Sequence, residues 1–358
     1  MQTSVKLVAA CAFFASAASA NTVTQNVSWT ITRPGATKTA RVVAYGDSIF
    51  AGYHGSISNV AKRAAPHVDA EYAQLAWGTN VEVYRRAKSG AVSSDIYNNK
   101  IVNERSYMQA ANTTVVAFEM CGNDFLQARS AFARQTGTCN YSGLDSALAT
   151  CTTYQEKAMQ FINANAAAGV KAKIIANLYY PGYNADNVNS GCNDPGTGKP
   201  VNKQQKFLPY IAHSNWRACT FAAKYGFSCA DAFAQYMGAD YDSNGDGLVD
   251  SVGLKWRAGE TEDAYVTRIV TTLRATIRDS NTHFVNASTS YDYLQSDDTH
   301  PTYTGGTIWV GFFGGTGTGS GGSDYTDAQL AGGRNPVWNQ LGHERLGWAL
   351  SGYSPAAP

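Results

Sequence analysis

A serine and a histidine far apart in the chain have the residue types that ester cleavage by a nucleophile needs. Ser48 ends a Gly-Asp-Ser run after an apolar stretch, and His300 ends an Asp-Asp-Thr-His run that precedes a proline. A serine hydroxyl becomes nucleophilic when a neighbouring base removes its proton. An acid three residues before the histidine can accept the Nδ1 proton and leave Nε2 as that base. We therefore expect Ser48 as nucleophile, His300 as base and Asp297 as the acid that orients it.

Each of these short motifs also has a simpler interpretation. Gly-Asp-Ser is typical of a strand-to-helix turn that its own side chains cap, and the histidine of the second motif can be a solvated loop residue. Among the six histidines, however, only His300 has an acid three residues before it. His54, just after the serine, and His343, in a helix-like stretch, are the alternative bases.

Two further motifs supply candidate donors for an oxyanion, which needs preorganised N–H groups. Gly90 follows a predicted strand at 81–84, and Asn123, whose side-chain amide is a two-proton donor, follows a predicted strand at 114–118. The backbone N–H of Ser48 is the third donor. Each motif alone is typical of an ordinary turn. Because the carboxyl ends of parallel strands share one edge of a sheet, we expect the three turns to meet there.

Taken together and in this order, the four motifs resemble those of the SGNH hydrolases, also called GDSL esterases and lipases. The resemblance spans about residues 40–301, and the four letters of the family name match Ser48, Gly90, Asn123 and His300. It implies an α/β fold, namely a flavodoxin-like three-layer α/β/α sandwich with a mainly parallel sheet, and hydrolysis of carboxylic esters without a metal at the reacting centre.

This sequence departs from the family pattern in two places. Ile49 follows the serine where the family usually has leucine, and Arg86 and Ala87 stand where an asparagine and a glycine often precede the Ser-Gly pair. The change at Arg86 and Ala87 would alter contacts around Gly90 but not Gly90 itself. The chain has no Gly-x-Ser-x-Gly elbow, which argues against the α/β-hydrolase fold.

The elements that must position these residues alternate between strands and helices, as expected for a parallel sheet covered on both faces. We predict one domain at 39–352, preceded by a polar lead-in at 21–38. A helix after the serine would direct its positive end at the site. The predicted helices are 49–65, 153–168, 262–278 and 336–350, further strands are 170–178 and 227–233, and a Gly-rich surface loop is 312–323.

The first twenty residues have the pattern of a secretory signal peptide. A charged start is followed by an apolar run to Phe14 and by small residues up to Ala20, after which we expect cleavage. The apolar run is too short to span a membrane. A lipoprotein site at Cys11 is the alternative, although the apolar run continues past it. We therefore expect a secreted, extracellular or periplasmic, protein.

Six cysteines remain once the signal peptide is removed. An even number in an exported chain predicts three disulfides. The shortest loops favour Cys139–Cys151 and Cys219–Cys229, which leaves Cys121 for Cys192. Metal binding by these cysteines is disfavoured, since no C-x-x-C pair occurs.

The charge balance argues against some partners. The chain has 28 Lys and Arg against 27 Asp and Glu, and loss of Lys6 with the signal peptide makes the two equal. No basic run indicates nucleic acid or an anionic membrane as partner. We expect a monomer whose partner is an ester substrate.

An insert at about 240–281 begins with a loop that resembles a calcium site. Oxygen ligands fall at positions 1, 3, 5, 7 and 9 of such a loop, and these are Asp242, Asn244, Asp246, the carbonyl of Leu248, and Asp250. Gly253 occupies position 12, where an acidic residue belongs. We predict a structural calcium ion, the alternative being a turn without an ion. In the helix predicted after it, Tyr265, Ile269, Leu273 and Ile277 form an apolar stripe expected to face the core.

The function that these patterns favour is that of a secreted serine ester hydrolase working through an acyl-enzyme. The resemblance favours lipid or fatty-acyl esters over O-acetyl groups on glycans. Acyl transfer is an alternative, since water exclusion decides the acceptor. The alternative of another class is a non-catalytic protein that binds glycans or surfaces, which the intact set of reactive residues disfavours.

Overall fold

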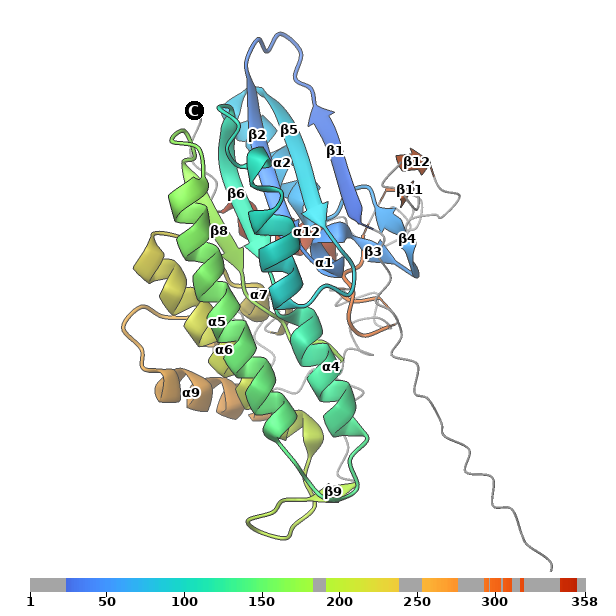
Figure 1. The fold of residues 1–358 in the computed structure, drawn as a ribbon, viewed down its shortest axis with the longest axis vertical. Helices are drawn as coiled ribbons and strands as arrows, with labels where there is room; N and C mark the ends of the chain where they lie inside the picture. The colour runs from blue at the N-terminus through green and yellow to red at the C-terminus, as the bar shows by residue number, and fades with distance from the viewer. Residues whose placement is uncertain are drawn as a thin grey trace, which may run out of the picture.

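A computed structural model describes residues 24–182, 191–237, 253–275, 293–295, 297–303, 305–310, 316–318 and 342–352. Its centre is a six-stranded sheet (Figure 1). In spatial order the strands are β1 (Gln25–Ile31), β5 (Asn80–Ala87), β2 (Thr39–Gly46), β6 (Thr113–Glu119), β8 (Ala172–Ala176) and β10 (Ser228–Ala230).

The strand order confirms the predicted fold class. All neighbouring strands are parallel except for the β1–β5 pair. Numbered along the chain without β1, the five parallel strands have the order 2-1-3-4-5 of flavodoxin-like sheets. Ligands of such folds bind where the order reverses, between the first and third strands. Those strands are β2 and β6, which precede Ser48 and Asn123.

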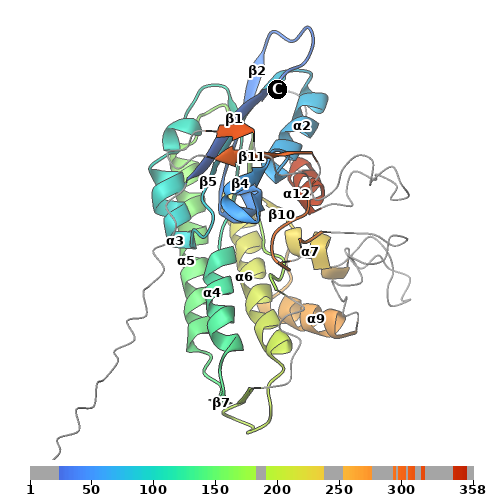
Figure 2. The same ribbon diagram turned by 90° about the vertical axis from the view of Figure 1, so that its right-hand side faces the viewer.

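Helices cover both faces of the sheet, which makes three layers (Figure 2). Successive side chains of the buried strand β6 pack on opposite faces of the sheet. Val116 and Phe118 lie in the core of one face, and Val115 and Ala117 lie in the core of the other. The first face packs against α4 (Gly122–Ala133), α5 (Ser142–Asn165), α6 (Lys203–Tyr225) and α9 (Glu262–Ala275). The second packs against α2 (Ala65–Trp77) and α12 (Gly342–Ser351), and α7 (Ala232–Met237) contacts both cores. The remaining helical segments are short: α1 (Ser48–Ala51), α3 (Ser93–Asp95), η1 (Ile96–Val102) and η2 (Arg105–Tyr107).

The helix predicted at 49–65 is wrong in extent. Helix α1 stops after one turn because Gly52 takes a left-handed conformation with φ 76°, where a Cβ atom would lie 2.8 Å from the Ala64 side chain. The chain then forms a small antiparallel sheet of β3 (Tyr53–His54), β4 (Ser56–Ala61), β11 (Thr307–Val310) and β12 (Thr316–Thr318). Strand β4 pairs with β11 from far along the chain, so a tertiary contact overrides the local helical pattern.

The described part of the lead-in predicted at 21–38, from residue 24 on, is part of the domain rather than a tail before it. Its alternating residues form β1, which pairs with β5 from Gln25 opposite Ala87 to Ile31 opposite Val81. Val27 is buried in the core and Gln25 is fully buried. Strand β1 was not predicted because it is an edge strand with several polar residues. It lacks the continuous apolar run by which the other strands were predicted.

Other elements agree with the sequence apart from their ends. Helix α5 begins eleven residues before the predicted 153–168 segment, and β8 and β10 lie inside the strands predicted at 170–178 and 227–233. Tyr265 and Ile269 of the predicted stripe on α9 are fully buried, which confirms its core contact. The side chains of Leu273 and Ile277 lie outside the described residues.

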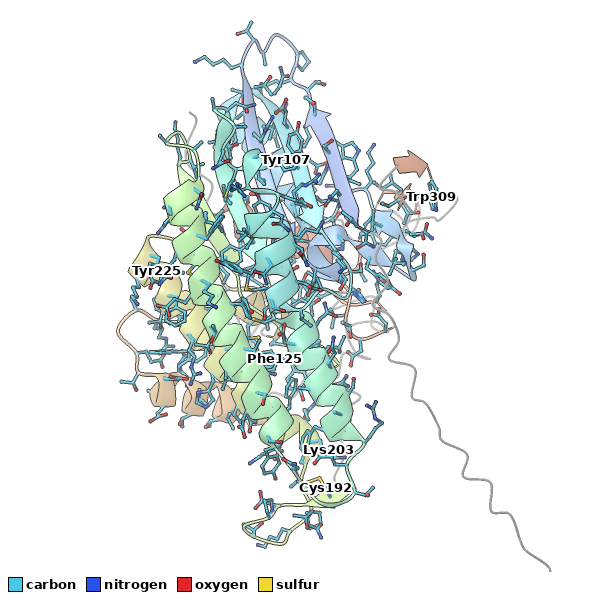
Figure 3. All side chains as sticks on the ribbon, in the orientation of Figure 1. Tyr107, Phe125, Cys192, Lys203, Tyr225 and Trp309 are labelled. Carbon is cyan, nitrogen blue, oxygen red and sulfur yellow. A yellow bond between two sulfur atoms is a disulfide. The ribbon has the colours of Figure 1, made fainter. Side chains whose placement is uncertain are left out.

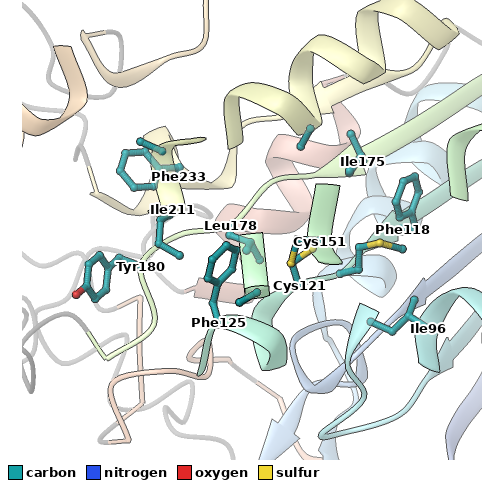
Figure 4. Close-up of a cluster of buried hydrophobic side chains, with 14 of the residues drawn as sticks. Ile96, Phe118, Cys121, Phe125, Cys151, Ile175, Leu178, Tyr180, Ile211 and Phe233 are labelled. Atoms are coloured by element: carbon teal, nitrogen blue, oxygen red, sulfur yellow. The ribbon is translucent and has the colours of Figure 1, made fainter. Parts of the chain in front are cut away.

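The disulfides correct two of the three predicted pairings. Cys219–Cys229 is present, but Cys139 bonds to Cys192. Pairing of β7 (Gly137–Thr138) with β9 (Cys192–Asn193) brings these cysteines together at the tip of the molecule (Figure 3). Cys151 instead points from α5 into the core near Cys121, and both are buried and unbonded (Figure 4).

Two predictions fall outside the described residues, namely the signal peptide at 1–20 and the calcium loop at Asp242–Asp250 with its ligands. Most of the Gly-rich segment 312–323 is also outside them. Within the ranges that are described, no helix is both long and apolar enough to cross a bilayer.

Candidate active site

Ser48 lies where β2 ends and α1 begins. It is largely buried, and Asp47 before it caps α1 by accepting the Ile49 N–H at 2.9 Å. Gly46 is required in this turn because a Cβ atom there would lie 2.3 Å from Glu119 Oε1. The turn is therefore built around a buried carboxyl group of the neighbouring strand β6.

Glu119 and Asp47 form a buried pair of carboxyl groups beneath the serine. Glu119 Oε1 accepts the Asp47 N–H at 2.5 Å, and the two side chains interact directly. Burial, and then the neighbouring Asp47 carboxyl, raise the pKa of Glu119 well above its ordinary value. Burial also raises the pKa of Asp47, although donors that include Ile49 and Asn123 oppose this shift. Glu119 was not predicted from the sequence, although its signal was a charged residue at the end of an apolar strand, four residues before Asn123.

Asn123 lies in the first turn of α4, within hydrogen-bond distance of the serine turn. Its Nδ2 atom donates to Asp47 Oδ2 at 2.9 Å and to the Ala91 carbonyl at 3.1 Å. Gly122 leaves room for this arrangement, because a Cβ atom there would lie 2.8 Å from Asp47 Oδ2. The structure thus brings two predicted site turns together through Asp47.

Gly90 lies in the loop that follows β5. Its φ of 78° favours glycine, and the space where a Cβ atom would point is open. The loop is held by Gln25 of β1, whose Oε1 accepts from the Ser89 N–H at 2.7 Å and whose Nε2 donates to the Ile57 carbonyl at 2.7 Å. No feature of the sequence indicated this role of Gln25, because the pairing of β1 with β5 was not predicted.

The predicted histidine–acid pair is formed. His300 Nδ1 lies 2.5 Å from Asp297 Oδ2, while Asp297 Oδ1 accepts the backbone N–H groups of Thr299 and His300 at 3.0 and 2.9 Å. Partial burial opposes ionisation of Asp297, but its bond to His300 and the charge of His300 hold its pKa below the ordinary value. Asp298 does not take this position; it has a left-handed φ of 56°.

The His300 loop contacts the chain just after the serine turn. The Tyr53 ring packs against the His300 imidazole at a tilt of 31°, with 4.3 Å between the ring centroids, and the Tyr179 hydroxyl donates to the Thr299 carbonyl. The charge of His300 also acts on the buried Asp47 carboxyl, which adjoins Ser48. Among the described residues, Ser48 Oγ makes no hydrogen bond to His300; such bonds are often loose without substrate.

His343 and His54, the alternative bases, lie in environments different from that of His300. His343 is fully buried, its Nδ1 accepts the Ala65 N–H at 3.3 Å, and burial lowers its pKa to about 3. The His54 ring packs edge-on against Tyr303. Neither contact holds an imidazole against a carboxylate as Asp297 holds His300.

Comparison with known proteins gives remote likenesses in structure. No protein-family model and no curated protein matches the chain. The lipase Lip_vut3 from a goat rumen metagenome is 18% identical, with a TM-score of 0.43 over 66% of this chain and 97% of that one. Phospholipase A1 from Streptomyces albidoflavus is 16% identical, with a TM-score of 0.40 over 66% and 99%. An acetyl xylan esterase from Geobacillus stearothermophilus is 10% identical, with a TM-score of 0.36 over 69% and 96%. At these values the likeness carries no inference about activity.

Proposed function

We propose that the chain is an exported serine hydrolase of carboxylic esters that works through a covalent acyl-enzyme. The observation that supports the proposal is the short contact between His300 Nδ1 and Asp297. The His300 ring also contacts Tyr53, which follows α1, and the charge of His300 acts on Asp47 beside Ser48. A histidine fixed in this tautomer presents Nε2 as a base, and Ser48, at the carboxyl end of β2, is the proposed nucleophile.

In the proposed mechanism, Ser48 Oγ attacks the ester carbonyl while His300 Nε2 takes its proton. His300 then gives this proton to the leaving alcohol, and the acyl group remains on Ser48. Water repeats the sequence, with His300 as base and then as acid, and releases the carboxylic acid. Asp297 keeps the imidazole oriented and stabilises its charged form.

The oxyanion would be held by the N–H groups of Ser48 and Gly90 and by the Asn123 amide. In the structure both N–H groups of this amide are engaged, one with Asp47 and one with the Ala91 carbonyl. To bind the oxyanion, the amide would exchange its bond to Ala91 for one to the substrate. Removing one such donor typically lowers kcat by about 10²–10³.

The experiment that tests this function compares Ser48→Ala with Ser214→Ala. Ser214 is also buried but lies on α6, outside the site. With p-nitrophenyl esters of increasing acyl length, the wild type and Ser214→Ala should hydrolyse substrate and Ser48→Ala should be inactive. Turnover by Ser48→Ala at the wild-type rate would refute the mechanism.

Rates on the same p-nitrophenyl esters, compared with the rate of acetate release from acetylated xylan, distinguish fatty-acyl esters from O-acetyl groups on glycans as substrates. We propose fatty-acyl esters as substrates, for which rates should rise with acyl length. Faster release of acetate from the glycan would instead assign O-acetyl esterase activity.

A further inference from the structure

The Asp47–Glu119 pair lies directly behind the nucleophile, yet the proposed mechanism assigns it no role. Both side chains are buried, with 1% and 2% of their surface exposed. Among the described residues neither forms an ion pair with a basic side chain. Two neighbouring carboxylates cannot both remain ionised in such an environment, because burial and mutual repulsion both disfavour the second charge.

The contacts indicate which of the two carries the proton. Each Asp47 oxygen accepts an N–H group, one from Ile49 and one from the Asn123 amide. Glu119 accepts the Asp47 N–H through Oε1, but its Oε2 has no donor among the described residues. A carboxylate is stabilised by donors to both oxygens, whereas an oxygen without a donor is the natural position for a proton.

We infer that Glu119 is a positioning residue, which as a neutral carboxyl group donates a hydrogen bond to Asp47 and thereby fixes the Asn123 amide and the Ser48 turn. This inference rests on the proposed function, because it deepens the oxyanion arrangement of the same site. Asp47 is the connection, since one of its oxygens caps α1 and the other holds the amide on α4.

The backbone is built to accommodate this pair. The Cβ position of Gly46 is filled by Glu119 Oε1, and that of Gly122 by Asp47 Oδ2. Both glycines belong to the motifs that contain the reacting residues. Glycines needed only to turn the chain would not have carboxyl oxygens where their Cβ atoms would be. The two glycines therefore leave space for the Asp47–Glu119 pair.

The test compares Glu119→Gln with Glu119→Ala. A glutamine amide can donate to Asp47 and accept from its N–H as the neutral acid does, so kcat for a p-nitrophenyl ester should stay within about threefold of the wild type. The alanine variant should lose about tenfold or more in kcat with little change in KM, a loss of the kind expected when an oxyanion donor is misplaced. Glu119→Leu, which fills the same space without polar atoms, serves as a second variant should the alanine variant fail to fold, and should show the same loss.

Two controls separate positioning from a general effect on folding. Glu82→Gln alters a carboxylate near the amino end of β5, away from the site, where it pairs with Arg41, and should leave kcat unchanged. In a double-mutant cycle, Glu119→Ala added to Asn123→Ala should cost much less than it does in the wild type, because both changes remove one unit.

Three results would overturn the inference: a glutamine variant as slow as the alanine variant, fully additive losses with Asn123→Ala, or normal kcat in both Glu119→Ala and Glu119→Leu. The proposed function is judged separately by the activity of the wild type and its loss in Ser48→Ala. Absence of wild-type turnover would overturn both.

Discussion

At the scale of single residues, the two adjacent aspartates of the His300 loop have different geometries. Asp297 contacts the imidazole through one oxygen and the loop backbone through the other. Asp298 occupies the left-handed region, in which aspartate and asparagine are both tolerated. Replacing each of these two aspartates in turn therefore tests which one orients His300.

Asp297→Asn should therefore lower kcat by about 10³–10⁴, because an amide favours the wrong histidine tautomer. Asp298→Asn should stay within a few-fold of the wild type. Steady-state kinetics of the two variants with one ester substrate decide this. Equal losses, or the larger loss at Asp298, would assign the orienting role to the other residue.

The candidate site residues could be proposed from the sequence because each belongs to a short motif, three of them at the end of a strand. Their supporting contacts could not. Gln25 reaches Ser89 only because β1 pairs with β5, and Tyr53 reaches His300 only because a hairpin interrupts the expected helix. Such contacts depend on tertiary pairing, which leaves no local signal.

At the scale of elements, the interface of α2 with α12 contains two adjacent buried groups with opposite pH responses. Burial raises the pKa of Glu344 to about 7 and lowers that of His343 to about 3. The raised pKa of Glu344 contributes stability that is present below its unfolded value near 4.5 and is lost as pH rises through 7. The depressed pKa of His343 contributes stability present above about 6.5 and lost as pH falls.

Glu344→Gln should make the protein less stable at acidic pH. It removes the gain in stability that protonation of Glu344 gives as pH falls, and that gain offsets the loss caused by His343. Between pH 7 and 5 the variant should lose roughly 2 kcal/mol more unfolding free energy than the wild type. Urea unfolding at both pH values measures this difference. His343→Gln should show the opposite change, and parallel pH profiles in all three proteins would contradict the assigned shifts.

The corrected disulfides leave Cys121 and Cys151 as neighbouring buried thiols that interact with one another. Cys121 has a φ of 86° and directly precedes the Gly-Asn pair of α4. Because we propose that the protein is exported, we predict that these two thiols form a disulfide. Exchange with an oxidised disulfide such as glutathione disulfide would join them and release two molecules of the reduced thiol.

Non-reducing peptide mapping of the secreted protein should reveal the Cys121–Cys151 link. Replacing both cysteines by alanine should lower the free energy of unfolding by about 2–4 kcal/mol. The Ser214→Ala variant, with its disulfides unchanged, is a suitable reference. Alkylation of both thiols in the unfolded, unreduced protein would show that this link does not form.

At the scale of the whole molecule, the order of the sheet brings distant motifs to one edge. Alternating strands and helices predicted the parallel sheet and its two covered faces. They could not predict the antiparallel edge strand β1 or the small sheet that joins β4 to β11, because both depend on pairings between remote segments.

Calcium remains a prediction for the loop at 242–250. Chelation should lower the melting temperature, since an ion that binds only the folded state stabilises it by mass action. Asp246→Ala should have the same effect and abolish the response to calcium, with little change in rate per folded molecule. Isothermal titration without heat of binding near millimolar calcium would identify the loop as a turn without an ion.

The most direct test of the account is the site at which a fluorophosphonate probe attaches. The probe forms a stable adduct with an activated serine, so mass spectrometry of the labelled, digested protein should place it on Ser48. Labelling should disappear in Ser48→Ala and fall strongly in Asp297→Asn. An adduct on another serine, or undiminished labelling of Ser48→Ala, would contradict the assignment of Ser48 as the nucleophile.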